Sequence, residues 1–249
     1  LIRFLKAGVI EEGTRRDTPQ GTPQGGILSP LLANIYLHYI LDLWFERVEK
    51  KQSQGYTELI RYCDDFIIGA QTKLQAQAIL KDIKERFKKF GLTLSEEKTK
   101  IVEFGRSVYE NSRNRGKRKP DTFSFLGFTH YCGKSQKGNF LVKYKTDKKR
   151  KRKHLNEMNK WLRAIRNQIK TKDIWKILSA KLRGHYNYYG ISSNSHDIQA
   201  YYYWTVRLTF KWLNRRSQKQ SFNWMTFNTY LERYPLPKPA LVHNLYDIW

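Results

Sequence analysis

Two adjacent acids between two apolar runs constrain the fold more than any other feature of this sequence. Asp64 and Asp65 follow Leu59 and Ile60 closely and precede the apolar residues 66–68. Short apolar and aromatic runs bounded by polar residues are typical of β-strands. The pattern therefore predicts a β-hairpin whose tight turn presents both carboxylates.

Neighbouring carboxylates repel each other, and a divalent cation between them removes that cost. Hard cations such as Mg²⁺ prefer carboxylate oxygens. The residues alone leave two interpretations open: Asp64 and Asp65 form a metal site, or they form a solvated hairpin turn without a ligand.

A loop rich in glycine and proline precedes the hairpin. Residues 21–30 hold three glycines and two prolines, so the backbone can approach a ligand closely. Ser29 followed by Pro30 is typical of a helix start, and the helix should continue to about Lys51. The loop is either an ordinary helix entry or a nucleotide platform with the Gln24 amide facing a sugar or base. The apolar stripe expected for the helix consists of Leu32, Ile35, Tyr39, Leu43 and Phe45.

The residues after the hairpin alternate between helical and extended patterns. A helix is predicted from about Lys73 to Phe90, with Gly91 as its stop. We expect a strand and turn over residues 91–101, a basic loop over 104–119 and a strand over 123–128. Alternating helix and hairpin indicates an α+β fold with an antiparallel sheet and helices on one face.

Positive charge is concentrated in the second half of the chain. The net charge is +25, and residues 131–249 hold 25 Lys+Arg against 6 Asp+Glu, whereas residues 1–130 hold 22 against 16. This excess predicts a polyanionic partner. Cys63 and Cys132 form no zinc spacing and no disulfide framework, which fits a reducing, intracellular compartment. No stretch is long and apolar enough to predict a membrane span.

Three amphipathic patterns follow one another after a cationic run, which indicates a small helical bundle. The run is either a solvated linker or part of an RNA-binding surface. Most of the tyrosines and tryptophans nearby are expected to pack in a core. The RNA-binding candidates are Lys148, Lys149, Arg150, Lys151, Arg152, Lys153, Arg163, Arg166, Arg183 and Tyr186.

Several motifs occur in the order seen in reverse transcriptases, and together they resemble the group II intron reverse transcriptase/maturase family. The resemblance covers roughly residues 1–130. Residues 183–189 and the following Trp-rich helix resemble the thumb and maturase-specific domain of the same family. The motifs of the first part are Thr22-Pro23-Gln24-Gly25-Gly26 with residues 29–34, Tyr62-Cys63-Asp64-Asp65, residues 91–99, and Phe125-Leu126-Gly127-Phe128.

The resemblance implies a partial right-hand polymerase palm followed by an α-helical thumb/maturase bundle. The expected domains are the partial palm at residues 1–130, a basic connector at 131–153 and the helical thumb/maturase domain at 154–249. The implied activity is RNA-directed DNA synthesis with maturase function. The implied partners are structured intron RNA, an RNA template with a DNA primer, and deoxynucleotides.

The resemblance also assigns roles to residues. Two Mg²⁺ ions, with Mn²⁺ as an alternative, would stabilise the attacking and leaving oxygens. Asp64 is the expected bridging ligand and Asp65 the second ligand, while Lys98 matches a lysine proposed to protonate pyrophosphate. The residues expected to contact the nucleotide are Pro23, Gln24 and Gly25, and those expected to contact the primer are Phe125, Leu126 and Gly127.

One departure from the family pattern shapes the functional expectation. Polymerase palms use a further Asp upstream of the Pro-Gln-Gly loop, and this chain begins too late to include it. We therefore expect a C-terminal part of a reverse transcriptase that polymerises poorly alone and gains activity from an N-terminal portion in trans. It would act in the cytoplasm or nucleoid, or in an organelle. The alternatives are a non-catalytic, RNA-binding splicing cofactor and, third, a bundle that binds DNA.

Overall fold

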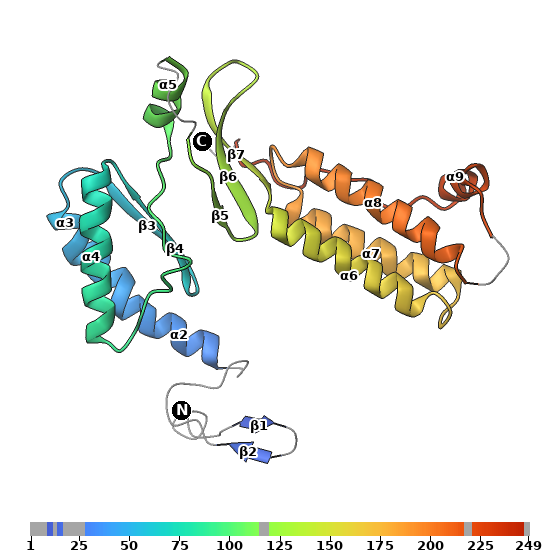
Figure 1. The fold of residues 1–249 in the computed structure, drawn as a ribbon, viewed down its shortest axis with the longest axis horizontal. Coiled ribbons are helices and arrows are strands. Elements are labelled where there is room, and N and C mark those ends of the chain that lie inside the picture. Colours follow the sequence, from blue (N-terminus) through green and yellow to red (C-terminus); the bar gives the residue numbers. More distant parts are fainter. Residues whose placement is uncertain (1–8, 12–13, 17–27, 115–119, 217–220, 247–249) are drawn as a thin grey trace. The chain divides into compact units, whose positions relative to one another are not determined.

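The computed structural model describes residues 9–11, 14–16, 28–114, 120–216 and 221–246 (Figure 1). The chain divides into two compact units, Leu1–Ile101 and Val102–Trp249. We call them unit 1 and unit 2 and describe each by itself. None of the helices in these ranges is long and apolar enough to cross a membrane.

Unit 1 is built from a helical segment, a hairpin and a second helix. A short antiparallel pair comes first, and its strands are β1 (Val9–Glu11) and β2 (Thr14–Arg16). The helical segment consists of α2 (Ser29–Leu37), the π-helical turns η1 (His38–Asp42) and η2 (Phe45–Glu49), and α3 (Lys50–Gln52). The hairpin and second helix are β3 (Thr57–Tyr62), β4 (Asp65–Ala70) and α4 (Lys73–Lys89).

The predicted hairpin is confirmed. Strands β3 and β4 pair antiparallel, with Tyr62 opposite Asp65, so Cys63 and Asp64 form the turn. The predicted helix after it is confirmed as α4, which begins after the Thr72 cap. Gly91 has a φ of +69°, a conformation that favours glycine and ends the helix where the sequence indicated.

The apolar stripe predicted for the first helix is wrong at Ile35 and Tyr39. Tyr39 and Ile35 are 64% and 48% exposed, whereas Ile40 and Leu41 are buried. From His38 onward the cause is η1 and η2, because each π-turn adds a residue to the helical repeat and rotates the buried face away from a 3.6-residue pattern. Ile35 lies before them in α2, which has no buried residue. Phe45 is buried as expected.

The core of unit 1 joins the helical segment to α4 across one face of the hairpin. Leu59, Phe66 and Ile68 from the two strands pack against it. The opposite face of the hairpin exposes Ile60. The buried residues of this core are Ile40, Leu41, Phe45, Ile79, Ile83 and Phe87.

Unit 2 combines a small sheet with a helical bundle. Its first helix is α5 (Arg106–Asn114), so the prediction of a loop over residues 104–119 is wrong there. At the end of unit 1, residues 92–101 form turns and irregular backbone instead of the strand we expected. Leu92 and Leu94 pack on the unit 1 core and pair with no strand among the described residues. The sheet has the antiparallel order β5 (Phe123–Phe125), β6 (Phe128–Lys134) and β7 (Phe140–Thr146).

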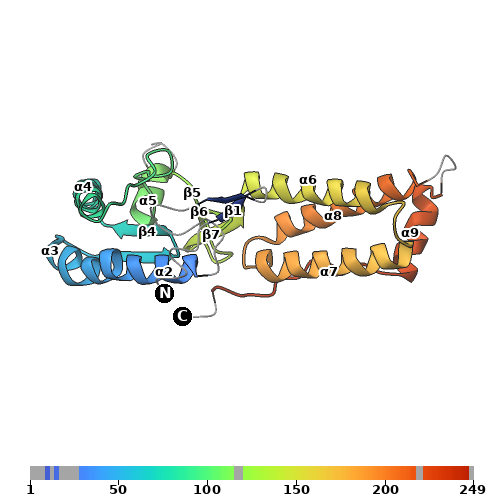
Figure 2. The same cartoon turned by 90° about the horizontal axis from the view of Figure 1, so that it is seen from below.

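Three long helices follow the sheet and lie alongside one another (Figure 2). The residues expected to form a connector, 131–153, hold most of β6, all of β7 and the start of the first long helix. Ile174, Leu178 and Leu182 are buried, as the sequence pattern predicted. The helices are α6 (Lys148–Ile165), α7 (Thr171–Tyr189) and α8 (Ser195–Leu213), and α9 (Trp224–Arg233) packs at their end.

Candidate active site and nucleic-acid interface

The β3–β4 turn exposes two adjacent carboxylates. Cys63 has a φ of +55°, the left-handed conformation that two-residue hairpin turns require. Asp64 lies in the turn, Asp65 begins β4, and both are exposed. Within the described part of the chain, neither carboxylate is paired with a cationic side chain. Both are therefore accessible to a ligand from solvent.

An ion pair fixes the base of this turn. Arg61 donates from Nε to Asp42 Oδ1 at 2.7 Å and from Nη2 to Asp42 Oδ2 at 2.5 Å. The same guanidinium donates to the Cys63 carbonyl at 2.7 Å and to Asn34 Oδ1 at 2.8 Å. Bidentate Arg–carboxylate pairs combine strength with a defined orientation. The turn is thereby tied to α2 and η1.

Both carboxylate oxygens of Asp42 accept hydrogen bonds from Arg61, so Asp42 is not available to a metal. The hydrogen bond from Arg61 is the main reason why the pKa of Asp42 lies below its ordinary value, although partial burial opposes the shift. The Asp42 side chain is 27% exposed and that of Arg61 is 13% exposed. Sequence reasoning missed this pair. The signal in the sequence was Arg61, a cation just before the turn, whose partner Asp42 lies 19 residues earlier.

The donor set at the hairpin tip suits a hard cation. Asp64 and Asp65 offer oxygen ligands only, which Mg²⁺ and Mn²⁺ accept. No group of three or more His, Cys, Asp or Glu side chains gathers anywhere in the residues with assigned positions. A metal bound at the tip would need water and a substrate to fill its coordination shell.

The other predicted active-site residues are distributed as follows. Pro23, Gln24 and Gly25 lie outside the described residues. Lys98 belongs to unit 1, like the two acids, and is exposed in a turn where its backbone N–H donates to the Ser95 carbonyl at 3.2 Å. Its ammonium group is therefore accessible from solvent.

The predicted primer-contact residues form a tight turn in unit 2. Leu126 and Gly127 have φ values of +49° and +80°. The Tyr188 hydroxyl donates to the Leu126 carbonyl at 2.8 Å, and a Cβ on Gly127 would lie 3.0 Å from the Tyr189 hydroxyl. Phe128 stacks on Tyr188 with ring centroids 5.6 Å apart. The last turn of α7 therefore holds this hairpin, a contact that the sequence did not reveal.

The cationic run of residues 148–153 is the beginning of α6, which excludes the linker interpretation. Asp147 caps the helix by accepting from the backbone N–H groups of Lys149 and Arg150. Lys151 points inward and pairs with Asp197 at 2.8 Å. The exposed members are Lys148, Lys149, Arg150, Arg152 and Lys153.

The remaining RNA-binding candidates differ in accessibility. Arg163 and Arg183 are exposed. Arg166 donates to the Arg215 carbonyl at 3.1 Å and lies over the Trp212 ring. Tyr186 is 4% exposed in the bundle core, where burial raises its pKa. A side chain buried to this extent reaches RNA only if the bundle opens.

Comparisons with known proteins place this geometry in context. A model of the family described as reverse transcriptase (RNA-dependent DNA polymerase) matches residues 3–130. The chain is 66% identical over 38 residues to the group II intron-encoded protein LtrA of Lactococcus lactis subsp. cremoris, covering 15% of this chain and 6% of that protein. It is 33% identical over 128 residues to protein YkfC of Escherichia coli, covering 41% and 34%.

A further relative is the COX1/OXI3 intron 1 protein of Saccharomyces cerevisiae. That match has 26% identity over 150 residues and covers 41% of this chain and 18% of the relative. In all three comparisons, the chain spans about a third or less of the relative's length.

Proposed function

The chain belongs to the reverse transcriptase family, of the group II intron reverse transcriptase/maturase type, and on that premise we propose that it takes part in RNA-directed DNA synthesis. In this proposal, unit 1 is part of a polymerase palm and carries the metal ligands. The bundle of unit 2 is the thumb/maturase portion and binds RNA.

The observation that carries the proposal is the presentation of Asp64 and Asp65. Both carboxylates are exposed and adjacent, and no cation of the described chain neutralises them. Meanwhile Arg61 and Asp42 neutralise each other at the base of the turn. Unpaired acids supported by a rigid pair are the arrangement expected of ligands that receive a metal together with its substrate.

The chemistry follows from these residues. When bound, Mg²⁺ would stabilise the charge that develops on the attacking and leaving oxygens of phosphoryl transfer. Asp64 and Asp65 would hold the metal through their carboxylate oxygens, with Asp64 as the main ligand. Arg61 positions both by holding the Cys63 carbonyl. Lys98 is exposed and supplies a proton to the departing pyrophosphate.

Two further segments complete the proposed substrate contacts. The loop of Pro23, Gln24 and Gly25 contacts the incoming nucleotide. The turn of Phe125, Leu126 and Gly127 contacts the primer terminus. The fixed docking of this turn on Tyr188 supports that role, because a primer 3′-hydroxyl must be held still for in-line attack.

Primer extension on an RNA template with a DNA primer tests the proposal. The chain is assayed alone and with an N-terminal reverse transcriptase segment supplied in trans. We expect Mg²⁺-dependent extension in the presence of that segment, and a fall of at least about a hundredfold for Asp64→Asn. Glu85→Gln is the matched control, because it removes an exposed acid of the same unit. Extension that survives Asp64→Asn would overturn the catalytic assignment.

The second candidate function is RNA binding as a splicing cofactor without chemistry. The exposed cations of α6 favour it, since phosphate contacts supply most of the affinity for structured RNA. Full RNA binding and intron splicing by an Asp64→Asn protein, with no primer extension by the unaltered chain, would select this function. Preference for duplex DNA over structured RNA at the same salt concentration would exclude it.

A further inference from the structure

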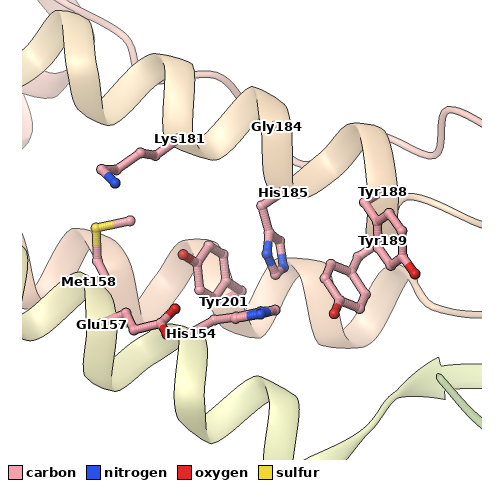
Figure 3. A pocket seen from close by; sticks show the side chains of 9 residues that line it. All are labelled: His154, Glu157, Met158, Lys181, Gly184, His185, Tyr188, Tyr189 and Tyr201. Atoms are coloured by element: carbon pink, nitrogen blue, oxygen red, sulfur yellow. The ribbon is translucent and has the colours of Figure 1, made fainter. Parts of the chain in front are cut away.

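A pocket of about 300 Å³ opens between α6, α7 and α8 in unit 2 (Figure 3). Its floor is formed by Met158, Tyr189 and Tyr201, all less than 10% exposed. Its rim includes the exposed residues Lys181 and Gly184. A mostly apolar cavity with a few polar groups is the usual form of a ligand site, and this volume is near the lower end for such sites.

Gly184 leaves one wall of the pocket open. It lies in the interior of α7, where glycine lowers helix stability relative to alanine. A Cβ built on Gly184 would meet no atom within 4 Å. Packing inside the protein therefore does not require a glycine here. The missing side chain instead lets a flat ligand approach the helix backbone.

The inner wall of the pocket consists of aromatic rings, two of which are histidine rings with polar nitrogen atoms. The His185 ring stacks on Tyr201 with centroids 3.7 Å apart and on Tyr189 at 4.7 Å. His154 meets His185 edge-on at 5.7 Å. Among the described residues, none hydrogen-bonds to the buried Nδ1 of His154. Tyr201 and Tyr189 thus cover both faces of the His185 ring, and a ligand with a polar edge would meet the unpaired nitrogen of His154.

The two histidines are neutral at ordinary pH. Burial lowers the pKa of His185 to about 3, and burial also lowers the pKa of His154. A neutral imidazole has one N–H and one lone pair, which match the edge of a nucleobase. A phosphate would instead favour charged histidines. The chemistry of the wall thus favours a base over an anion.

The charges around the rim suit the phosphates on either side of such a base. Lys181 lies at the rim, and Arg150 and Lys153 act electrostatically on His154 from the same helix. Glu157 is the acid at the rim, and its carboxylate lies 3.9 Å from Lys153 Nζ. These exposed cations favour a polyanionic ligand over an aromatic side chain of a partner protein.

We propose that the pocket between α6, α7 and α8 accepts one unpaired nucleobase of a bound RNA, with the base against Gly184, its polar edge toward His154 and its flanking phosphates at the rim cations. The inference rests on the proposed function, since it assigns a recognition site within the RNA-binding bundle. It gives that bundle a means of selecting RNA with a bulged or looped-out base.

Two RNA hairpins test this inference with the full chain. One carries a single bulged 2-aminopurine, and the other is identical but lacks the bulge. We expect the unaltered protein to bind the bulged hairpin at least about fivefold more tightly, close to the net contribution of one hydrogen bond. The 2-aminopurine fluorescence should also change on binding.

Substitution of Gly184 then narrows the pocket, and a Cβ at this position meets no protein atom within 4 Å. Gly184→Leu should remove the preference for the bulge and leave binding to the paired hairpin unchanged. Gly184→Ala should remove part of the preference while raising the melting temperature, because alanine is the better helix former. Ala164→Leu is the control, since Ala164 is exposed on α6 outside the pocket.

The outcomes separate this inference from the function on which it rests. Equal binding of both hairpins by the unaltered protein, or a preference that survives Gly184→Leu, would overturn the base pocket and leave RNA binding intact. Failure to bind either hairpin at low salt would overturn RNA binding itself. If Gly184→Leu does not fold, the Gly184→Ala protein decides the question through its partial loss of preference.

Discussion

The two units of this chain support their functional residues in opposite ways. Unit 1 has a core of six buried residues and presents its acids at the tip of a two-stranded hairpin. Unit 2 has a core of fourteen buried residues in the described chain, and its cations lie along the surface of long helices. The ion pair Arg61–Asp42 fixes the base of the turn in unit 1, whereas an extensive core supports the surface of unit 2.

Charge separates the units as clearly as their cores do. Unit 1 holds 16 Lys+Arg against 13 Asp+Glu, a net of +3, and unit 2 holds 31 against 9, a net of +22. A metal site needs unpaired acids, which a strongly basic surrounding would neutralise. Nucleic-acid affinity needs the reverse. Under the proposed function, metal binding and RNA binding would therefore be supported by separate parts of the chain.

The largest expected effect is on the stability of unit 2. Asn194 is 1% exposed, accepts from the Thr146 backbone N–H at 2.8 Å and donates to the Tyr189 carbonyl at 2.8 Å. Asn194→Ala leaves these buried groups without a hydrogen-bond partner and should lower the free energy of unfolding by about 3 kcal/mol. Urea unfolding followed by tryptophan fluorescence measures this. Asn228→Ala, on the exposed surface of α9, should change it little.

That variant also tests the independence of the units. If Asn194→Ala lowers the unfolding midpoint of unit 1 equally, as measured by hydrogen exchange of β3 and β4, the two units fold as one. The contrast between two independently supported units would then be wrong.

The next effect concerns the hairpin of unit 1. Arg61→Gln removes the ion pair to Asp42 and should cost about 2 kcal/mol, within the range for hydrogen bonds to charged groups. It should also lower primer extension, because the Cys63 carbonyl loses its anchor. Arg47→Gln is the matched control, since Arg47 is exposed on η2. Unchanged extension by Arg61→Gln would show that the turn needs no support from this pair.

A smaller effect distinguishes two kinds of cation within one run. Arg150 and Lys153 are exposed, whereas Lys151 pairs with Asp197. The double variant Arg150→Gln/Lys153→Gln should reduce the salt dependence of RNA binding by about 0.7 per lost phosphate contact. Lys151→Gln should leave the salt dependence unchanged and lower stability instead. Identical slopes for the two variants would contradict the placement of Lys151.

A further difference between the units is in pH dependence. The pKa of His185 is lowered by burial to about 3, so the unfolded chain binds a proton below about pH 6.5 while the folded chain does not. The stability of unit 2 should therefore decline as pH falls from about 6.5. The lowered pKa of Asp42 acts on unit 1 only below about pH 4. Thermal unfolding between pH 7 and pH 4 measures the difference.

A histidine on the surface provides the control for this pH effect. His185→Phe keeps an aromatic ring and should flatten the decline of unit 2. His196→Gln should not, since the His196 side chain is 91% exposed. A decline that persists unchanged in His185→Phe would assign it to another group.

The local sequence pattern predicted the structure correctly where the structure depends on neighbouring residues. The hairpin around Asp64 and Asp65, helix α4 with its stop at Gly91, and the buried stripe of α7 were all predictable. In each of these, alternation or a 3.6-residue period is uninterrupted. Within the helical segment the pattern failed at Tyr39, because π-turns change the period and leave no mark in composition.

Local sequence was enough to predict the pair of acids in a turn, the basic second half and the resemblance to a polymerase family. Which charges are available depends instead on the folded chain. Among the described residues, Asp42 pairs with Arg61 and Lys151 with Asp197, Asp64 and Asp65 have no cationic partner, and Tyr186 is buried. The physical reason is that a residue's partners come from distant parts of the chain, whereas a local pattern describes only its neighbours.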